Sequence, residues 1–211
     1  MTALLIDTAF ESCQVGLWDN DVCITMASVP GGGKHDVVLA PLVDEMLKVH
    51  GVKIKDLAEI IVTTGPGRFT GLRVGIAFAR GLALVYKTPL KGVLTTEALA
   101  WEMRRGNATG PMAVIVTVKR GESFIQRIMP ENKGGKSGIE RVMDADLAQY
   151  FAKDNGIKLA GVMTPEVQEI VKTLSHIQVM ENITEPSLKA IKAVAATLAQ
   201  GAGIIRPYYA V

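Results

Sequence analysis

Short apolar runs and amphipathic stretches alternate along the first half of the chain. Residues 3–6 and 60–62 are continuous apolar runs, as expected for buried strands. Residues 13–18 and 22–28 alternate between apolar and polar positions, which predicts the two strands of a hairpin. Residues 36–50 carry apolar side chains at helical spacing. This half therefore predicts strands paired around a central buried strand, with an amphipathic helix packed on them.

The second half repeats this theme in a shorter form. Strands are predicted at residues 112–118, 123–129 and 159–162, and helices at residues 144–153, 165–174 and 184–200. Two similar sets in one chain predict a duplicated α/β unit. The polar, glycine-containing segment 104–111 is the predicted boundary, which gives an N-terminal lobe of residues 1–104 and a C-terminal lobe of residues 105–211.

Composition excludes several classes of protein. The 211 residues carry 23 Lys and Arg against 21 Asp and Glu, so a formal net charge of +2 does not favour nucleic-acid binding through bulk charge. Hydrophobic residues make up 48% of the chain and charged residues 21%, as in ordinary globular proteins. No apolar run reaches the ~20 residues of a membrane span, and the N-terminus lacks the positive region of a signal peptide. We therefore expect a cytoplasmic protein without a membrane partner.

The two cysteines fall on the two arms of the predicted hairpin, which turns near residues 19–21. In that register Cys13 lies opposite Ala27 rather than Cys23. We therefore expect two buried thiols and no disulfide bond.

A glycine-rich segment follows the strand at residues 60–62 and opens a helix expected over residues 70–86, with Thr70 as its cap. Backbone amides in such a place can hold a phosphate. The spacing fits neither a P-loop nor the dinucleotide fingerprint. Asp7, at the end of the first strand, is either a ligand for a nucleotide's magnesium through water or a turn-forming carboxylate. The candidate nucleotide or phosphate residues are Asp7, Thr8, Gly65 and Gly67.

The helix expected at residues 70–86 is apolar nearly all round. Gly71, Gly75 and Ala79 are spaced by four, and small residues at that spacing allow another helix to approach closely. Arg73 and Arg80 share one face and could pair with carboxylates of a partner. We interpret this helix as an interface; the alternative is a core helix with two solvated arginines.

The sequence offers no catalytic or metal site. The three histidines, at positions 35, 50 and 176, have no metal-ligand spacing. No serine stands in a nucleophile elbow.

A longer pattern is carried by Leu5-Ile6-Asp7-Thr8 and by the run Gly-Pro-Gly-Arg-Phe-Thr-Gly-Leu-Arg-Val-Gly at residues 65–75. It resembles the TsaB (YeaZ) family of tRNA threonylcarbamoyladenosine biosynthesis proteins, the small members of a glycoprotease-like family. The resemblance is strong over residues 1–100 and weak beyond them. It implies the two-lobed ASKHA fold of actin, Hsp70 and sugar kinases, with duplicated RNase H-like mixed sheets and flanking helices.

The resemblance also implies a non-catalytic role. Such proteins pair with the catalytic paralogue TsaD and the ATPase TsaE to place threonylcarbamoyl on the tRNA adenosine beside the anticodon. It implies no cofactor in this chain, ATP or ADP only at the interface of the complex, and tRNA contact only through the complex. The paralogue's metal helix carries His-x-x-x-His, whereas here Leu39 stands four residues after His35, as in a pseudo-enzyme.

In the family, the helices that correspond to residues 36–50 and 70–86 form the face that pairs with the paralogue. In the isolated protein, the same face pairs with a second copy. The implied interface residues are Val38, Leu42, Met46, Thr70, Gly71, Arg73, Val74, Gly75, Phe78, Ala79 and Leu82. A stand-alone ATP-binding hydrolase or kinase of the ASKHA type, using Asp7, Gly65 and Gly67, is the alternative. A peptidase is disfavoured because the chain offers neither a metal pair nor a nucleophile.

Overall fold

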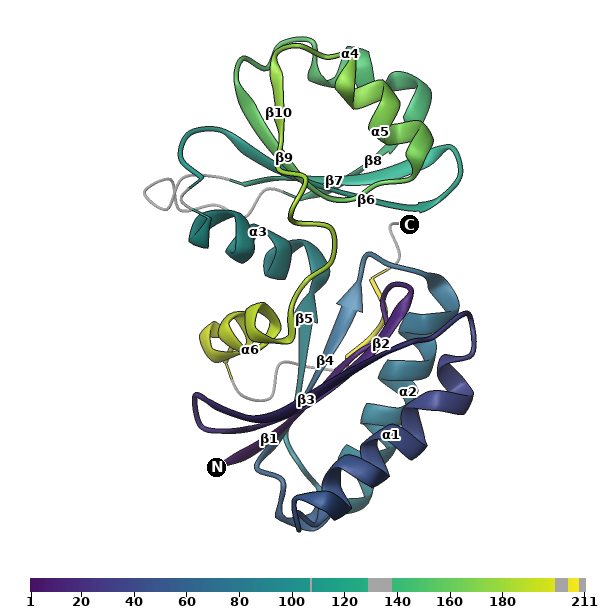
Figure 1. Cartoon of the computed structure of the whole chain (residues 1–211), viewed down its shortest axis with the longest axis vertical. Coiled ribbons are helices and arrows are strands. Elements are labelled where there is room, and N and C mark those ends of the chain that lie inside the picture. The colour runs from purple at the N-terminus through teal and green to yellow at the C-terminus, as the bar shows by residue number, and fades with distance from the viewer. Residues whose placement is uncertain (107, 129–137, 200–204, 209–211) are drawn as a thin grey trace. The chain divides into compact units, whose positions relative to one another are not determined.

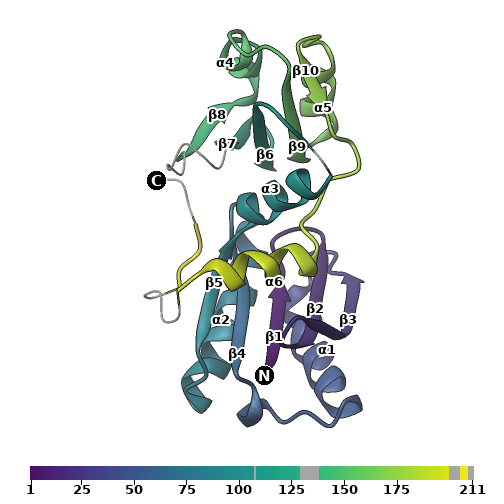
Figure 2. The ribbon, with the colours of Figure 1, turned by 90° about the vertical axis from the view of Figure 1, so that its left-hand side faces the viewer.

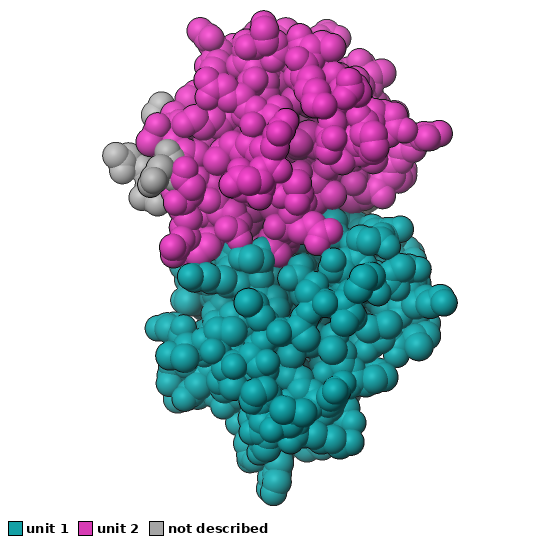
Figure 3. Space-filling view, in the orientation of Figure 1, with its two compact units in different colours: residues 1–95, 187–208 teal, residues 96–186, 209–211 magenta. Residues whose placement is uncertain are grey.

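The computed structural model describes residues 1–106, 108–128, 138–199 and 205–208. The chain forms two compact units (Figures 1 and 3). Unit 1 comprises Met1–Thr95 together with Ser187–Tyr208, and unit 2 contains Thr96–Pro186. Each unit is built on one five-stranded sheet.

The sheet of unit 1 has the strand order β3-β2-β1-β4-β5. Its strands are β1 (Thr2–Asp7), β2 (Ser12–Asp19), β3 (Val22–Pro30), β4 (Glu59–Gly65) and β5 (Leu90–Leu94). Strands β3, β2 and β1 are antiparallel, whereas β1, β4 and β5 are parallel. The helices α1 (His35–Val49) and α2 (Phe69–Tyr86) cover one face, and α6 (Leu188–Thr197) covers the other (Figure 2). A 3-10 turn, η1 (Ile54–Asp56), leads into β4.

Alternation along the strands selects the core of unit 1. Leu4 and Ile6 of β1 are fully buried beneath the helices, together with Val62 of β4. Leu39 and Val43 supply the matching face of α1. Each fully buried side chain of this size contributes roughly 1.5–3 kcal/mol relative to exposure. The continuous apolar runs of β1 and β4 reflect their central positions, where both faces are covered.

The sheet of unit 2 repeats this plan, with the strand order β8-β7-β6-β9-β10. Its strands are β6 (Met112–Lys119), β7 (Glu122–Ile128), β8 (Ile139–Met143), β9 (Ile157–Val162) and β10 (Ile177–Val179). Again the first three are antiparallel and the last three are parallel. The helices of this unit are α3 (Thr95–Arg105), α4 (Leu147–Phe151) and α5 (Pro165–Lys172), with a 3-10 turn η2 (Asp144–Asp146) before α4. The same order and directions in both units confirm the duplicated, two-lobed ASKHA architecture.

The units divide differently from the expected boundary at residue 104. Helix α3 falls in unit 2 apart from its first residue, Thr95, and the chain returns to unit 1 from Ser187 onward. The return is held by α6, whose Leu188 packs against Gly16 of β2. The strands β8 and β10 were not expected, because they are short and half-exposed. The last helix, α6, is shorter than the expected helix at residues 184–200. Residue 129, the predicted end of the strand at 123–129, and residue 200, the predicted end of the last helix, lie outside the described residues.

A nearly buried ion cluster fixes α6 to the sheet. The carboxylate of Glu59 lies 3.0 Å from Nζ of Lys91 and 3.4 Å from Nζ of Lys192. Lys91 also donates a hydrogen bond of 3.1 Å to the carbonyl oxygen of Ala195 on α6. Removing the shared acid leaves two ammonium groups close together with little water to solvate them.

Glu59→Gln is therefore expected to lower the free energy of unfolding by about 2 kcal/mol, because it removes the charge that both lysines share. Urea titration monitored by circular dichroism measures this. Asp44→Asn is the matched control, because it breaks the exposed 2.6 Å pair with Lys48 and should cost less than about 0.5 kcal/mol. Equal losses for the two variants would contradict a stabilising role for the cluster.

Candidate functional site

The end of β1 meets the end of β4 in a small polar cluster. Oδ1 of Asp7 accepts a hydrogen bond of 2.6 Å from the Thr63 hydroxyl and one of 2.9 Å from the backbone amide of Ala9. Asp7 is 1% exposed. Its carboxylate thus holds the turn that follows β1, which favours the turn-forming interpretation over the magnesium-binding one.

The adjacent Thr8 contacts the first turns of α2. Its hydroxyl donates a hydrogen bond of 2.8 Å to the carbonyl oxygen of Gly71. A Cβ atom on Gly71 would overlap the carbonyl oxygen of Thr8, and one on Gly75 would overlap the Thr8 hydroxyl. Two glycines one helical turn apart therefore allow α2 to approach β1.

The interpretation of the Gly71, Gly75 and Ala79 stripe as a surface for a partner helix was wrong. All three residues are buried within unit 1, and the first two face Thr8 of the same chain. The helix is apolar nearly all round, so its sequence did not identify the inward side. Helix α2 begins at Phe69 after Arg68, so the expected cap by Thr70 was also wrong.

The glycine-rich loop is filled by the chain itself. A Cβ atom on Gly67 would lie 2.7 Å from the carbonyl oxygen of Ala9, which also accepts a hydrogen bond of 2.7 Å from the Arg68 amide. The carbonyl oxygen of Thr64 accepts a hydrogen bond of 2.6 Å from the Tyr208 amide. The next residue, Gly65, has a φ angle of 104° and lies beside the Tyr208 carbonyl oxygen. The structure thus brings Asp7, Thr8, Gly65 and Gly67 together, as expected, with Ala9 packed among them.

His35 opens α1 and is 4% exposed. Its ring lies against Gly31, where a Cβ atom would come 2.5 Å from Nε2. Leu39, four residues later, is buried in the apolar core. Within the described residues, no group of three or more His, Cys, Asp or Glu side chains could hold a metal ion.

The residues expected to contact a partner differ in burial. Met46, Gly71, Gly75 and Ala79 are buried in the chain; Val38, Leu42, Val74, Phe78 and Leu82 are half-buried; Thr70 and Arg73 are exposed. The half-buried residues are all apolar, and they pack at the margin of the core below α1 and α2.

The exposed apolar side of α2 was not predicted from the sequence. Ala77 and Gly81 are small and exposed there, and Leu84 and Val85 are 82% and 71% exposed. The spacing of Ala77, Gly81 and Leu84 by four and three residues is the signal that could have identified this side. Among the described helices, α2 is the one with the length and mean hydropathy, 1.3, of a membrane span, although its inner side is buried in unit 1.

Both cysteines are free, as expected, but only one is buried. Cys13 pairs in register with Val29 rather than Ala27, and a bulge between Leu17 and Trp18 accounts for one residue of this difference. Cys23 lies on the turn side of the bulge and pairs with Trp18. Cys23 is exposed on the edge strand β3, so the expectation that it is buried was wrong. Burial, and secondarily the charge of Asp7, raises the pKa of Cys13 from 9.0 to about 11.

The comparisons with known proteins agree with this architecture. The family model described as TsaD, tRNA N6-adenosine threonylcarbamoyltransferase, matches residues 28–172, more than half of the chain. The chain belongs to the TsaD family. The resemblance to TsaB (YeaZ) members is confirmed by several curated relatives.

The TsaB protein of Escherichia coli K12 is 32% identical over 140 residues, which are 66% of this chain and 60% of that protein. The TsaB protein of Bacillus subtilis 168 is 31% identical over 124 residues, 59% of this chain and 53% of that protein. The chain therefore spans less than two thirds of these relatives in each match. A Pseudomonas aeruginosa structure described as similar to peptidase YEAZ shares the fold, with a TM-score of 0.76, 21% identity and coverage of 99% of this chain and 98% of that one.

Gly75→Ala and Gly81→Ala form a matched pair on α2. The first should cost about 1–3 kcal/mol of stability, because the added methyl group overlaps the Thr8 hydroxyl. The second should gain up to about 1 kcal/mol, because no atom lies within 4 Å of the added Cβ and alanine favours the helix. Urea unfolding of both variants measures the difference. A similar change in both would show that Gly75 does not face the chain's own strand.

The buried Cys13 predicts a pH dependence of stability. Its folded pKa, about 11, lies above the unfolded value of 9.0, so its contribution is complete below pH 9 and is lost as the pH rises toward 11. Wild type should therefore lose more stability across this interval than Cys13→Ala, in which the group is absent. Urea unfolding at several pH values measures it, with Cys23→Ala as the control that should follow wild type. Superimposable pH profiles of wild type and Cys13→Ala would rule out the assigned shift.

Proposed function

We propose that the chain is a non-catalytic subunit in the synthesis of threonylcarbamoyladenosine on tRNA. Family membership and similarity to curated TsaB proteins support the pathway. The observation that carries the non-catalytic role is the filled end of β1 and β4. There, Asp7 binds Thr63 and Ala9, and Ala9 occupies the space beside Gly67. A substrate phosphate would have to displace the chain's own backbone.

In this proposal the chain acts in the cytoplasm by binding a TsaD-type transferase, with a TsaE-type ATPase as a further partner. Any ATP or ADP lies at the interface of the complex, and tRNA is reached through the complex. Alone, the chain pairs with a second copy through the surface that binds the transferase.

The proposed interface lies over α1 and α2. Its apolar part consists of half-buried residues, including Val38 on α1 and Val74 and Phe78 on α2. Arg73 is exposed beside them, where its guanidinium stacks 5.2 Å from the ring centroid of Phe69. Such residues can contribute apolar contact area and a charge that selects the partner without supporting the monomer's core. The buried members of the expected set, including Gly75, act indirectly by positioning α2.

The test is the mass in solution of the full chain, alone and mixed with the transferase from the same organism, by light scattering behind a sizing column. We expect a dimer alone and a one-to-one complex in the mixture. Arg73→Glu should weaken the complex at least about tenfold, because a charged contact is reversed. It should change the stability of the chain by less than about 0.5 kcal/mol, because the residue is exposed.

Lys153→Glu, an equal charge reversal at an exposed position of unit 2, is the control and should leave the complex unchanged. A chain that remained indifferent to the transferase would contradict the proposal. Turnover of ATP with magnesium by the isolated chain would favour the stand-alone hydrolase or kinase instead.

A further inference from the structure

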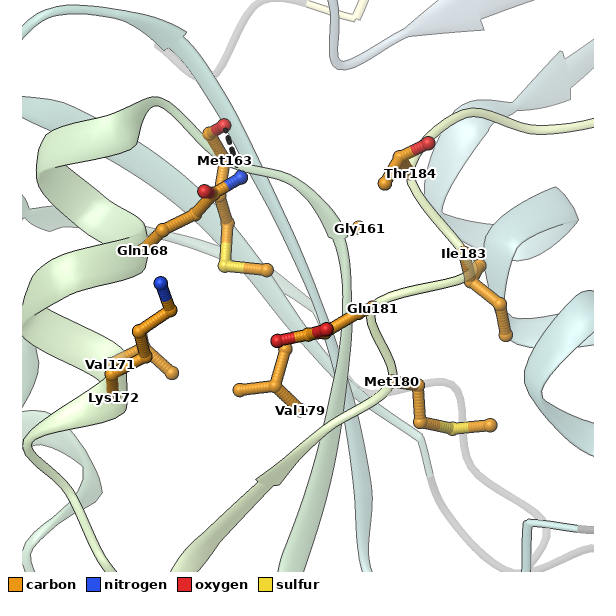
Figure 4. Close-up of a pocket in the computed structure, with 10 residues that line it drawn as sticks. All are labelled: Gly161, Met163, Gln168, Val171, Lys172, Val179, Met180, Glu181, Ile183 and Thr184. Carbon is orange, nitrogen blue, oxygen red and sulfur yellow. Dashed lines mark hydrogen bonds between the residues drawn. The ribbon is translucent and has the colours of Figure 1, made fainter.

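Unit 2 contains a hollow that the pairing surface does not use. Its volume is about 340 Å³, and it lies at the end of β9 between α5 and the segment that follows β10 (Figure 4). It is lined by Gly161, Met163, Gln168, Val171, Lys172, Val179, Met180, Glu181, Ile183 and Thr184. The carboxyl ends of parallel strands are the usual location of ligand sites in open α/β sheets. The volume is near the lower end of the range for ligand pockets, which favours a small ligand.

Backbone contacts define the walls of this hollow. Gly161 has φ 136°, and a Cβ atom there would overlap the carbonyl oxygen of Ile115 on β6. The amide of Gly161 donates a hydrogen bond of 3.0 Å to the carbonyl oxygen of Ile183, and the amide of Met180 donates one of 2.8 Å to Leu159. The segment after β10 is thus tied over the end of β9. On the opposite wall, Thr164 caps α5 by accepting from the Val167 amide.

Opposite charges enter the hollow from its two walls. Lys172 extends from α5, and Glu181 extends from the segment after β10 toward the same space (Figure 4). Lys172 has one exposed partner, Glu169, at 3.1 Å. Over the part of the chain that the structure describes, the Glu181 carboxylate has no hydrogen bond or ion pair, and it is not paired with Lys172. A ligand that carries one charge of each sign would satisfy both groups.

The surface between the two charges includes apolar side chains. Met163 and Val179 lie there, between Lys172 and Glu181 (Figure 4), and both are half-buried, so a ligand can contact them. The flexible side chain of Met163 adapts to a ligand's shape. This surface suits a short aliphatic group.

We propose that this hollow binds a free α-amino acid with a small aliphatic side chain. Lys172 binds the α-carboxylate, Glu181 binds the α-ammonium group, and the aliphatic side chain lies on Met163 and Val179. Two charge-assisted contacts give the site its selectivity, because a molecule that lacks either charge forms only one of them. The proposal does not depend on pairing with a transferase, and it concerns the isolated full chain.

The experiment is an NMR titration of the isotope-labelled full chain with L-valine, L-valinamide and N-acetyl-L-valine. Valine should shift the amide signals of Gly161, Glu181 and Thr184 with saturation in the millimolar range. Valinamide lacks the anion and N-acetylvaline lacks the cation, so each should bind at least about tenfold more weakly. Equal binding of all three compounds, or no shifts at the hollow at millimolar valine, would overturn the proposal.

Two variants assign the roles of the charged residues. Glu181→Gln should weaken valine binding about tenfold while leaving that of N-acetylvaline nearly unchanged, because that compound has no ammonium group. Lys172→Gln should weaken valine and leave valinamide nearly unchanged. Glu169→Gln removes the exposed partner of Lys172 without altering the lining and should preserve binding. If Glu181→Gln weakened all three compounds equally, a merely structural role would replace the proposed contact.

Discussion

The close approach of α2 to the end of β1 is the contact on which unit 1 depends. Gly71 and Gly75 allow the helix to reach Thr8, and the Thr8 hydroxyl bonds the carbonyl oxygen of Gly71. This approach places Gly67 against Ala9 and so determines the path of the loop before the helix. The outer side of α2 is consequently oriented away from the sheet. One backbone contact thus fixes both the filled strand end and the exposed surface proposed for pairing.

The two units have sheets of the same topology but differ in what lies at the carboxyl ends of the strands. In unit 1, the carboxyl ends of the central strands are filled by the turn after Asp7 and by the segment at Tyr208. In unit 2, the corresponding end of β9 is bordered by a hollow with one charge on each wall. A duplicated architecture therefore does not imply duplicated chemistry, because the loops at the strand ends decide what space is left.

Much of this architecture could be predicted from the sequence. The buried strands β1, β4 and β6 are continuous apolar runs, and the two similar sets of elements indicated the duplication. The strands β8 and β10 could not be identified, because strands of five and three residues are too short to show a periodic signal. The inward side of α2 was misassigned, since a helix that is apolar nearly all round has no unique buried side. The partners of Asp7 come from distant segments, and no local pattern reports them.

The return of α6 to unit 1 has a consequence for synthesis on the ribosome. Unit 2 lies within the chain between the two segments of unit 1, so its described elements all emerge before α6 does. The sheet of unit 1 is made early, yet the face that α6 covers stays open until the last residues of the helix leave the exit tunnel. Unit 1, whose synthesis begins first, is therefore completed last. A nascent chain stalled before Leu188 presents an uncovered apolar face of this sheet to chaperones.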